Sequence, residues 1–145
     1  MNGEFCVAAH ALVYLHHKGV PLSSEALAEN ICTHPVRVRR VLSRLRAAGL
    51  VASKEGEGGG YRFCGEAGAV TLLQVADALG IRCVELRWRS GSVDMECLVA
   101  SGMGNLMEGL ADDLDQRCRQ RLAALTIADL EGCLFDGLKF ERSSP

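Results

Sequence analysis

The sequence predicts a mainly α-helical protein with one small β-hairpin. Three observations lead to this fold class: apolar residues recur at helical spacing, a glycine-rich run separates two short extended segments, and one long amphipathic stripe fills the second half. The chain has 145 residues, of which 48% are hydrophobic, and only 3 prolines. This composition excludes a disordered or collagen-like chain and fits either one compact globular domain or a domain with one long appendage. We expect the domain at 1–80, and a linker, a long dimerisation helix and a short terminal helix at 81–145.

Two helices are predicted at the start of the chain. The first spans 4–18 and ends at Gly19, before a proline. The second is short, begins after Ser23 or Ser24 as its N-cap, and ends near Asn30. The apolar residues at helical spacing in the first helix are Phe5, Ala8, Ala9, Leu12 and Leu15.

A third helix is predicted immediately afterwards. Thr33 is expected to cap its start, and Pro35 fits the first turn because a missing N–H costs little there. Gly49 ends it as a left-handed cap would. Its apolar stripe consists of Val38, Val41, Leu42 and Leu45.

The predicted hairpin follows directly. Its strands cover 50–54 and 61–64, and the run EGEGGG at 55–60 connects them. Three helices, the third of them basic, followed by a two-stranded hairpin are the element order of a winged helix-turn-helix domain. Thr71 is then expected to cap a helix that continues through Leu79.

The remainder of the chain contains the long stripe. Residues 81–92 fit either a strand or a loop, and a helix of roughly seven or eight turns is predicted from Asp94. A single amphipathic helix cannot bury its stripe alone, so we expect a second subunit to cover it. Thr126 caps a last helix at 127–134, and 141–145 are expected to fray. The stripe comprises Val99, Met103, Leu106, Leu110 and Leu114, with Cys118, Leu122 and Leu125 as its extension.

Charge divides the chain after Cys64, although the formal net charge of the whole is only -2. Residues 1–64 carry 8 basic and 5 acidic side chains, a net charge of +3, and 65–145 carry 8 and 13, a net charge of -5. Arginine offers a planar donor fork that suits phosphates and guanine edges. Five arginines lie within ten residues that contain no acid: Arg37, Arg39, Arg40, Arg44 and Arg46.

Such a run can simply form a solvated helix face, but its place in a winged domain favours contact with DNA. Side chains at the start of the third helix reach base edges, and the wing glycines let the backbone approach phosphates. Glu55 and Glu57 oppose this role for the wing. The expected DNA-contacting residues are Thr33, His34, Val36, Arg37, Arg40 and Arg44 in and before the helix, and Gly59, Gly60, Tyr61 and Arg62 in the wing.

Other function classes find little support. The sequence has no phosphate-binding loop, no zinc-type CxxC pair and no GxSxG, so we expect no catalysis, metal or cofactor. No apolar run reaches the roughly 18 residues of a membrane helix, and Glu4 lies where a secretory signal carries basic residues. We therefore expect a soluble cytoplasmic protein.

Seven cysteines are many for this length, and their odd number argues against a secreted disulfide framework. Cys32 precedes the third helix, whose dipole would favour the thiolate, and Cys97 lies near the long helix. Both are candidate redox sensors, with simple packing as the alternative. Cys118 lies on the stripe and is expected to pack there.

Three motifs together resemble the Rrf2 family of bacterial winged-helix regulators. They are THPVRVRRVL at 33–42, LRAAGLV at 45–51 and GEGGGYRF at 56–63, and TIADL at 126–130 follows in the family's order. The resemblance covers about 4–135. It implies a homodimeric repressor that binds double-stranded operator DNA through the third helix and the wing, with the long helix crossing between subunits.

The family resemblance leaves the signal open. Its cluster-binding branch has three closely spaced cysteines, whereas Cys83, Cys97 and Cys118 here are 14 and 21 residues apart. Cys97 matches a cysteine of cluster-free thiol-switch relatives, and Cys32 resembles the thiol that these relatives pair across the dimer. An iron-sulfur or metal sensor, and a protein-interaction module without DNA binding, are the alternatives.

Overall fold

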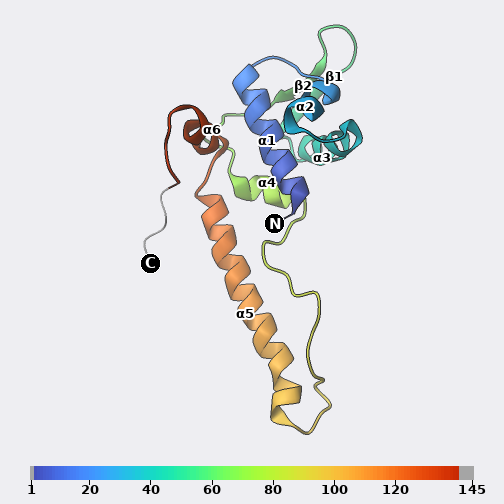
Figure 1. Ribbon diagram of the computed structural model, residues 1–145, viewed down its shortest axis with the longest axis vertical. Coiled ribbons are helices and arrows are strands. Elements are labelled where there is room, and N and C mark those ends of the chain that lie inside the picture. The colour runs from blue at the N-terminus through green and yellow to red at the C-terminus, as the bar shows by residue number, and fades with distance from the viewer. Residues whose placement is uncertain (1, 141–145) are drawn as a thin grey trace.

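The computed structural model describes residues 2–140. The expected fraying at 141–145 therefore lies outside the described residues. The mainly helical fold with a small antiparallel sheet is confirmed (Figure 1). The elements are α1 (Gly3–Lys18), α2 (Ser24–Ile31), α3 (Pro35–Ala47), β1 (Val51–Lys54), β2 (Gly60–Phe63), α4 (Leu72–Ala78), α5 (Leu98–Ala123) and α6 (Ile127–Phe135).

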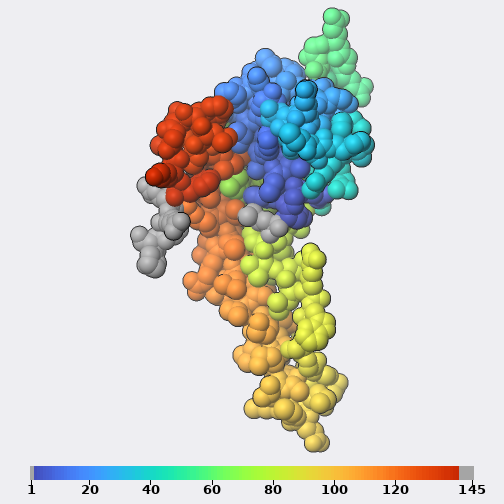
Figure 2. Space-filling view, in the orientation of Figure 1, coloured from blue at the N-terminus to red at the C-terminus, as the bar shows by residue number. Residues whose placement is uncertain are grey.

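The molecule consists of a body and an arm. The body contains residues 2–80 and 124–140, and the arm contains the linker 81–97 and α5. In Figure 1 the linker runs away from the body and α5 returns beside it. The hairpin projects from the opposite end of the molecule (Figure 2). No helix among residues 2–140 is long and apolar enough to cross a bilayer.

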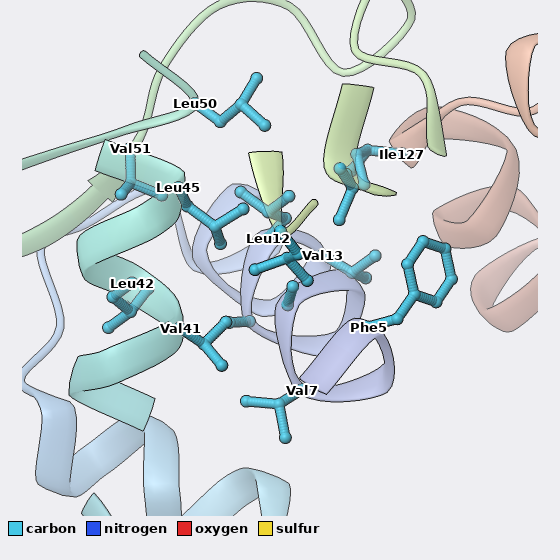
Figure 3. Close-up of a cluster of buried hydrophobic side chains, with 14 of the residues drawn as sticks. Phe5, Val7, Leu12, Val13, Val41, Leu42, Leu45, Leu50, Val51 and Ile127 are labelled. Atoms are coloured by element: carbon cyan, nitrogen blue, oxygen red, sulfur yellow. The ribbon is translucent and has the colours of Figure 1, made fainter. Parts of the chain in front are cut away.

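The hydrophobic core lies in the body, where α1, α3 and α4 meet (Figure 3). The predicted stripe of α3 is confirmed, because Val38, Val41, Leu42 and Leu45 are all buried. Leu12 of α1 and Leu27 of α2 are wholly buried against it. Burying one face of α3 turns its opposite face to the solvent.

The start of α3 differs from the prediction. The N-cap is His34, whose Nδ1 accepts the N–H of Val36 at 3.2 Å, and not Thr33. Thr33 instead donates its own N–H to the carbonyl of Ala28 at 3.0 Å and so completes the end of α2. The α2–α3 turn is too short to leave Thr33 for a cap. The predicted end is confirmed, since Gly49 has a φ of 77°.

The hairpin is tied to the turn between α1 and α2. Its strands pair antiparallel, with Val51 opposite Phe63 and Lys54 opposite Gly60. Leu22 and Tyr61 exchange two backbone hydrogen bonds of 2.9 and 2.8 Å. The wing is thus anchored to a third segment of backbone.

The long helix begins at Leu98, four residues later than Asp94, where the sequence placed it. Just before it, the chain folds back over the first turn, with Gly91 at a φ of 70° and the N–H of Ser92 bonded to the carbonyl of Ala100 at 3.0 Å. Residues 94–97 form this reversal and so cannot be helical. The ambiguous segment 81–92 contains no strand.

Side chains fasten the linker to α5. The buried Asp115 accepts the N–H groups of Cys83 at 2.8 Å and Val84 at 3.0 Å. Arg82 reaches Asp112 at 2.7 Å, and further out Arg89 reaches Glu108 at 2.7 Å. The arm is therefore a single unit of linker and helix.

Helix α6 belongs to the body. It packs on α1, where a carboxylate oxygen of Glu131 lies 2.6 Å from His16 Nδ1 in a hydrogen bond. His17 stacks on Phe135, with the ring centroids 4.2 Å apart. The N–H of Ile127 also donates to the carbonyl of Val70 at 3.0 Å. The chain thus leaves the body at the linker and re-enters it after α5.

The Asp115 contacts predict a pH dependence of stability. The N–H of Val84, and after it that of Cys83, lower the pKa of Asp115 against the opposing effect of burial. A carboxylate with a lowered folded-state pKa stabilises the fold at neutral pH and loses this effect as it is protonated. We expect Asp115→Asn to reduce the free energy of unfolding at pH 7, and the difference from wild type to shrink below the ordinary aspartate pKa of about 3.9.

Urea titrations followed by circular dichroism at several pH values measure this difference. Asp113→Asn removes a solvent-exposed carboxylate of the same helix and is the control, with little effect at any pH. A difference for Asp115→Asn that is unchanged between pH 7 and pH 3 contradicts the prediction.

Candidate nucleic-acid interface

The outer face of α3 combines one arginine with small and apolar side chains. Arg40 has 65% of its side chain exposed and Val36 is 57% exposed. Ser43 and Ala47 continue the same row and are exposed. This row is opposite the buried stripe, so it is the part of α3 best placed to enter a groove.

Arginines on one flank of α3 lie against the start of α1. Glu4 accepts Arg40 at 2.6 Å and Arg44 at 3.1 Å. The guanidinium of Arg37 lies over Gly3, where a β-carbon would come within 2.3 Å of it. Two of the three arginines expected to face DNA thus share one carboxylate of their own chain.

Arginines on the other flank contact α2 and the wing. Arg39 donates to Glu25 at 3.1 Å, and Arg46 donates to the hydroxyl of Ser53 at 2.7 Å. Arg46 therefore links the end of α3 to β1.

The residues at the start of α3 present polar groups to the solvent. Since His34 Nδ1 accepts a backbone N–H, the neutral ring carries its proton on Nε2. That nitrogen remains a donor for an external acceptor. Thr33 lies beside it in the turn before α3 and is half-buried.

The wing glycines have a structural role that the sequence did not reveal. A β-carbon on Gly59 would lie 2.2 Å from the carbonyl oxygen of Lys54, and one on Gly60 would lie 2.8 Å from that of Leu22. Tyr61 packs against the core, while Arg62 points outward and is exposed. Among the predicted wing residues, Arg62 is the one with a charged group available to a phosphate.

Cys32 occupies a different position from the one expected. It is the C-cap of α2, in the left-handed conformation at a φ of 59°, and its thiol donates to the carbonyl of Glu29 at 3.7 Å. The predicted stabilisation by a helix amino terminus is therefore wrong for this residue. The thiol is nevertheless exposed.

Cys97 has the helix position that Cys32 lacks. It is the N-cap of α5 at the tip of the arm and is exposed, and its side chain makes no capping hydrogen bond of ordinary geometry. The nearby N–H groups of Ala100, and after it Val99, lower the pKa of the Cys97 thiol. Cys97 is thus an accessible thiol with increased thiolate character.

The fold and the basic α3 beside an anchored wing define a winged helix-turn-helix transcriptional regulator with a long carboxyl-terminal helix. The chain belongs to the Rrf2 family, whose model, described as an iron-dependent transcriptional regulator, matches residues 1–131. The HTH-type transcriptional regulators IscR of Photobacterium profundum and Vibrio cholerae are each 30% identical to it over 129 residues. These matches cover 89% of this chain and 72% of each relative.

Solved structures support the same fold. A candidate transcriptional regulator from Lactobacillus plantarum superposes with a TM-score of 0.80 at 26% identity, over 92% of this chain and 91% of that one. CymR, the global cysteine regulator of B. subtilis, gives a TM-score of 0.68 at 23% identity, over 91% and 95% of the two chains. The predicted family and fold are confirmed.

The three cysteines weighed as cluster ligands, Cys83, Cys97 and Cys118, are not gathered in one place within one chain. Cys97 and Cys118 lie 21 residues apart along α5, which is about 31 Å at 1.5 Å per residue. The N–H of Cys83 donates to Asp115, three residues before Cys118, so Cys83 lies at the Cys118 end of α5. Among residues 2–140 no group of three or more His, Cys, Asp or Glu side chains is gathered to hold a metal ion.

The glycine contacts predict which substitution the wing tolerates. We expect Gly59→Ala to lower the free energy of unfolding by about 1–3 kcal/mol, because the new methyl group meets backbone that must shift. Gly68→Ala is the matched control, since its β-carbon meets nothing within 4 Å and its φ is not positive. Urea denaturation of both variants measures the effect, and equal stabilities contradict it.

Proposed function

We propose that this protein is a homodimeric repressor that binds a specific operator in double-stranded DNA and releases it when its thiols are oxidised. The observation that carries the DNA-binding role is the exposed row of α3, with Arg40 at its centre and an anchored wing beside it. In helix-turn-helix proteins the second helix of the motif lies in the major groove and its first residues contact base edges. In this chain those residues are His34 and Val36.

The chemistry of the row fits base and phosphate recognition. The Nε2–H of His34 and the guanidinium of Arg40 are donors for guanine or phosphate, and Val36 offers an apolar contact to a thymine methyl group. Arg62 on the wing adds a charge outside the groove.

The exposed face of α5 supports a dimer. Linker and body cover the face that contains Gly104, Ala111, Asp115 and Leu122, all buried. A second, apolar face lies roughly a third of a turn away and is open to solvent. A monomeric protein rarely exposes such a row, and an identical helix is its natural cover. The row comprises Val99 at 65%, Met103 at 39%, Leu106 at 70%, Leu110 at 50% and Leu114 at 43% exposure.

The redox response follows from where the exposed thiols lie. Cys32 is in the body beside α3, and Cys97 is at the far tip of the arm (Figure 1). A bond between them within one chain is out of reach, so the partner's arm would have to deliver Cys97. Such a bond would rotate the two α3 helices out of successive major grooves, and each lost arginine contact costs about 1–3 kcal/mol.

Binding to DNA is tested with a duplex selected from a randomised pool, in fluorescence anisotropy at several salt concentrations. We expect Arg40→Ala to weaken binding by about 5- to 150-fold. Arg117→Ala also removes an exposed, ion-paired arginine, but on α5, and is the matched control with unchanged affinity. Glu4→Gln leaves Arg40 and Arg44 without their carboxylate and is expected to bind more tightly.

The same experiment separates the alternative of a protein-interaction module. A phosphate-binding protein must weaken as salt rises. Failure to enrich any duplex, together with salt-insensitive behaviour, would overturn the DNA-binding proposal.

The dimer is tested by placing a charge in the exposed apolar row of α5. Leu106→Asp should convert the protein to a monomer in analytical ultracentrifugation, because an identical partner would bury the carboxylate against apolar side chains. Val20→Asp changes a valine of the body that is 53% exposed, and this variant should remain dimeric. A wild type that sediments as a monomer at micromolar concentration refutes the homodimer.

The intersubunit bond is tested by oxidising the protein with peroxide and running a non-reducing gel. We expect a covalent dimer that disappears in both Cys32→Ser and Cys97→Ser. Cys133→Ser keeps the other thiols intact and serves as the control. A covalent dimer that persists in Cys97→Ser assigns the bond elsewhere.

A further inference from the structure

Two cysteines far apart in the sequence lie on neighbouring segments where the arm joins the body. The N–H of Cys83, in the linker, donates to Asp115 Oδ1 at 2.8 Å. Cys118 follows Asp115 by three residues on α5, so both side chains project from the same side of the helix. The backbone bond thus brings Cys83 to the helix surface that carries Cys118.

The electrostatics of the two thiols agree with this geometry. Burial raises the pKa of Cys83, and the neighbouring Cys118 raises it further, followed by Asp115. Both thiols are half-buried. Nearby, Arg119 of α5 reaches Asp77 of α4 at 2.9 Å, which holds this end of the helix to the body.

We propose that Cys83 and Cys118 form a disulfide within one chain when the protein meets a peroxide. A disulfide needs α-carbons within about 7 Å, and the bond of the Cys83 N–H to Asp115 holds residue 83 against the turn of α5 that carries Cys118. This pair is separate from the intersubunit pair of Cys32 and Cys97. Both members lie in the same subunit, so the bond needs no dimer.

The chemistry balances with one peroxide molecule. The Cys118 thiol releases its proton to the solvent and the thiolate attacks a peroxide oxygen. The O–O bond breaks, a sulfenic acid forms, and the departing hydroxide takes up a proton to become water. The sulfur of Cys83 then attacks the sulfenic sulfur, the S–S bond forms, the S–O bond breaks, and a second water leaves. The two sulfurs supply the two electrons that reduce the peroxide. Burial raises the pKa of the Cys83 thiol and so lowers its thiolate fraction, which makes Cys83 the second sulfur to react.

The bond would close a loop from 83 to 118 that contains the whole tip of the arm. It would add a covalent connection beside the Asp115 hydrogen bonds and so fix the linker at the base of α5. If the proposed dimer is correct, that base sets the angle between α5 and the body and hence the spacing of the two α3 helices. This consequence, unlike the bond itself, rests on the proposed function.

Peptide mapping of the full-length protein tests the bond directly. The protein is oxidised with hydrogen peroxide, remaining thiols are alkylated with N-ethylmaleimide, and trypsin is added. Cleavage after Arg82 and Arg117 places Cys83 and Cys118 at the starts of separate peptides. We expect a peptide pair linked by a reducible bond, an intact monomer mass lower by two hydrogen atoms, and a thermal midpoint raised by several degrees.

Variants identify the order of the reaction. Cys83→Ser should lose the linked pair and accumulate a sulfenic acid on Cys118, which dimedone traps. Cys64→Ser removes another half-buried cysteine and should retain the bond. Cys32→Ser and Cys97→Ser should also retain it, which separates this inference from the intersubunit switch.

Alkylation of Cys83 and Cys118 in the fully oxidised protein overturns the intrachain bond, whatever happens at Cys32 and Cys97. If the reduced protein binds no DNA, the proposed function is overturned, but the inference of an intrachain disulfide is not affected. A dimedone adduct on Cys83 in a Cys118→Ser variant, without one on Cys118 in Cys83→Ser, reverses the proposed order and contradicts it.

Discussion

One buried carboxylate holds the two parts of this molecule in register. The residues next to Asp115 in α5 are almost all exposed, whereas Asp115 itself is buried and only 7% exposed. The linker covers it, and two backbone N–H groups of the linker donate to its carboxylate. Without these bonds the linker would leave two partly buried donors unpaired and would have no fixed path along α5. The direction of the arm, and with it the placement of Cys97, depends on this contact.

Helix α5 has two different surfaces: a covered face, which contains Asp115, and an apolar face that is open to solvent. Gly104 lies on the covered face, where Arg89 passes so closely that a β-carbon would come within 2.6 Å of its Nε. From the sequence alone, a glycine inside a helix only lowers the intrinsic helix propensity. Within the chain it provides room for an arginine of the linker, and the apolar row beside it stays open.

Periodicity and capping chemistry were sufficient to predict most of the fold. The stripe of α3, the glycine at its end and the capping threonines of α4 and α6 are local features, and the structure confirms them. The start of α5 could not be predicted, because a fold-back onto Ala100 excludes residues that are otherwise compatible with a helix. The sequence interpretation also placed Cys32 at the start of α3, whereas the conformation of the α2–α3 turn makes it the C-cap of α2.

The site was harder to predict than the fold. A run of arginines shows that α3 is basic, but not that Glu4, more than thirty residues earlier, bonds two of them, or that Ser53 accepts a third. The wing glycines illustrate the same limit. The sequence shows that they are flexible, whereas only the packed structure shows backbone of Lys54 and Leu22 where a side chain would lie.

The position of Glu4 has a consequence for how such a regulator would search a genome. Any phosphate that approaches Arg40 or Arg44 must compete with a carboxylate that is already bound, and it meets this competition at every non-specific site. Non-specific affinity falls, while a correct sequence can compensate through base contacts that random DNA lacks. Under the proposed function, the first turn of α1 would shorten the time spent on wrong sites, so that fewer molecules would keep one correct site occupied.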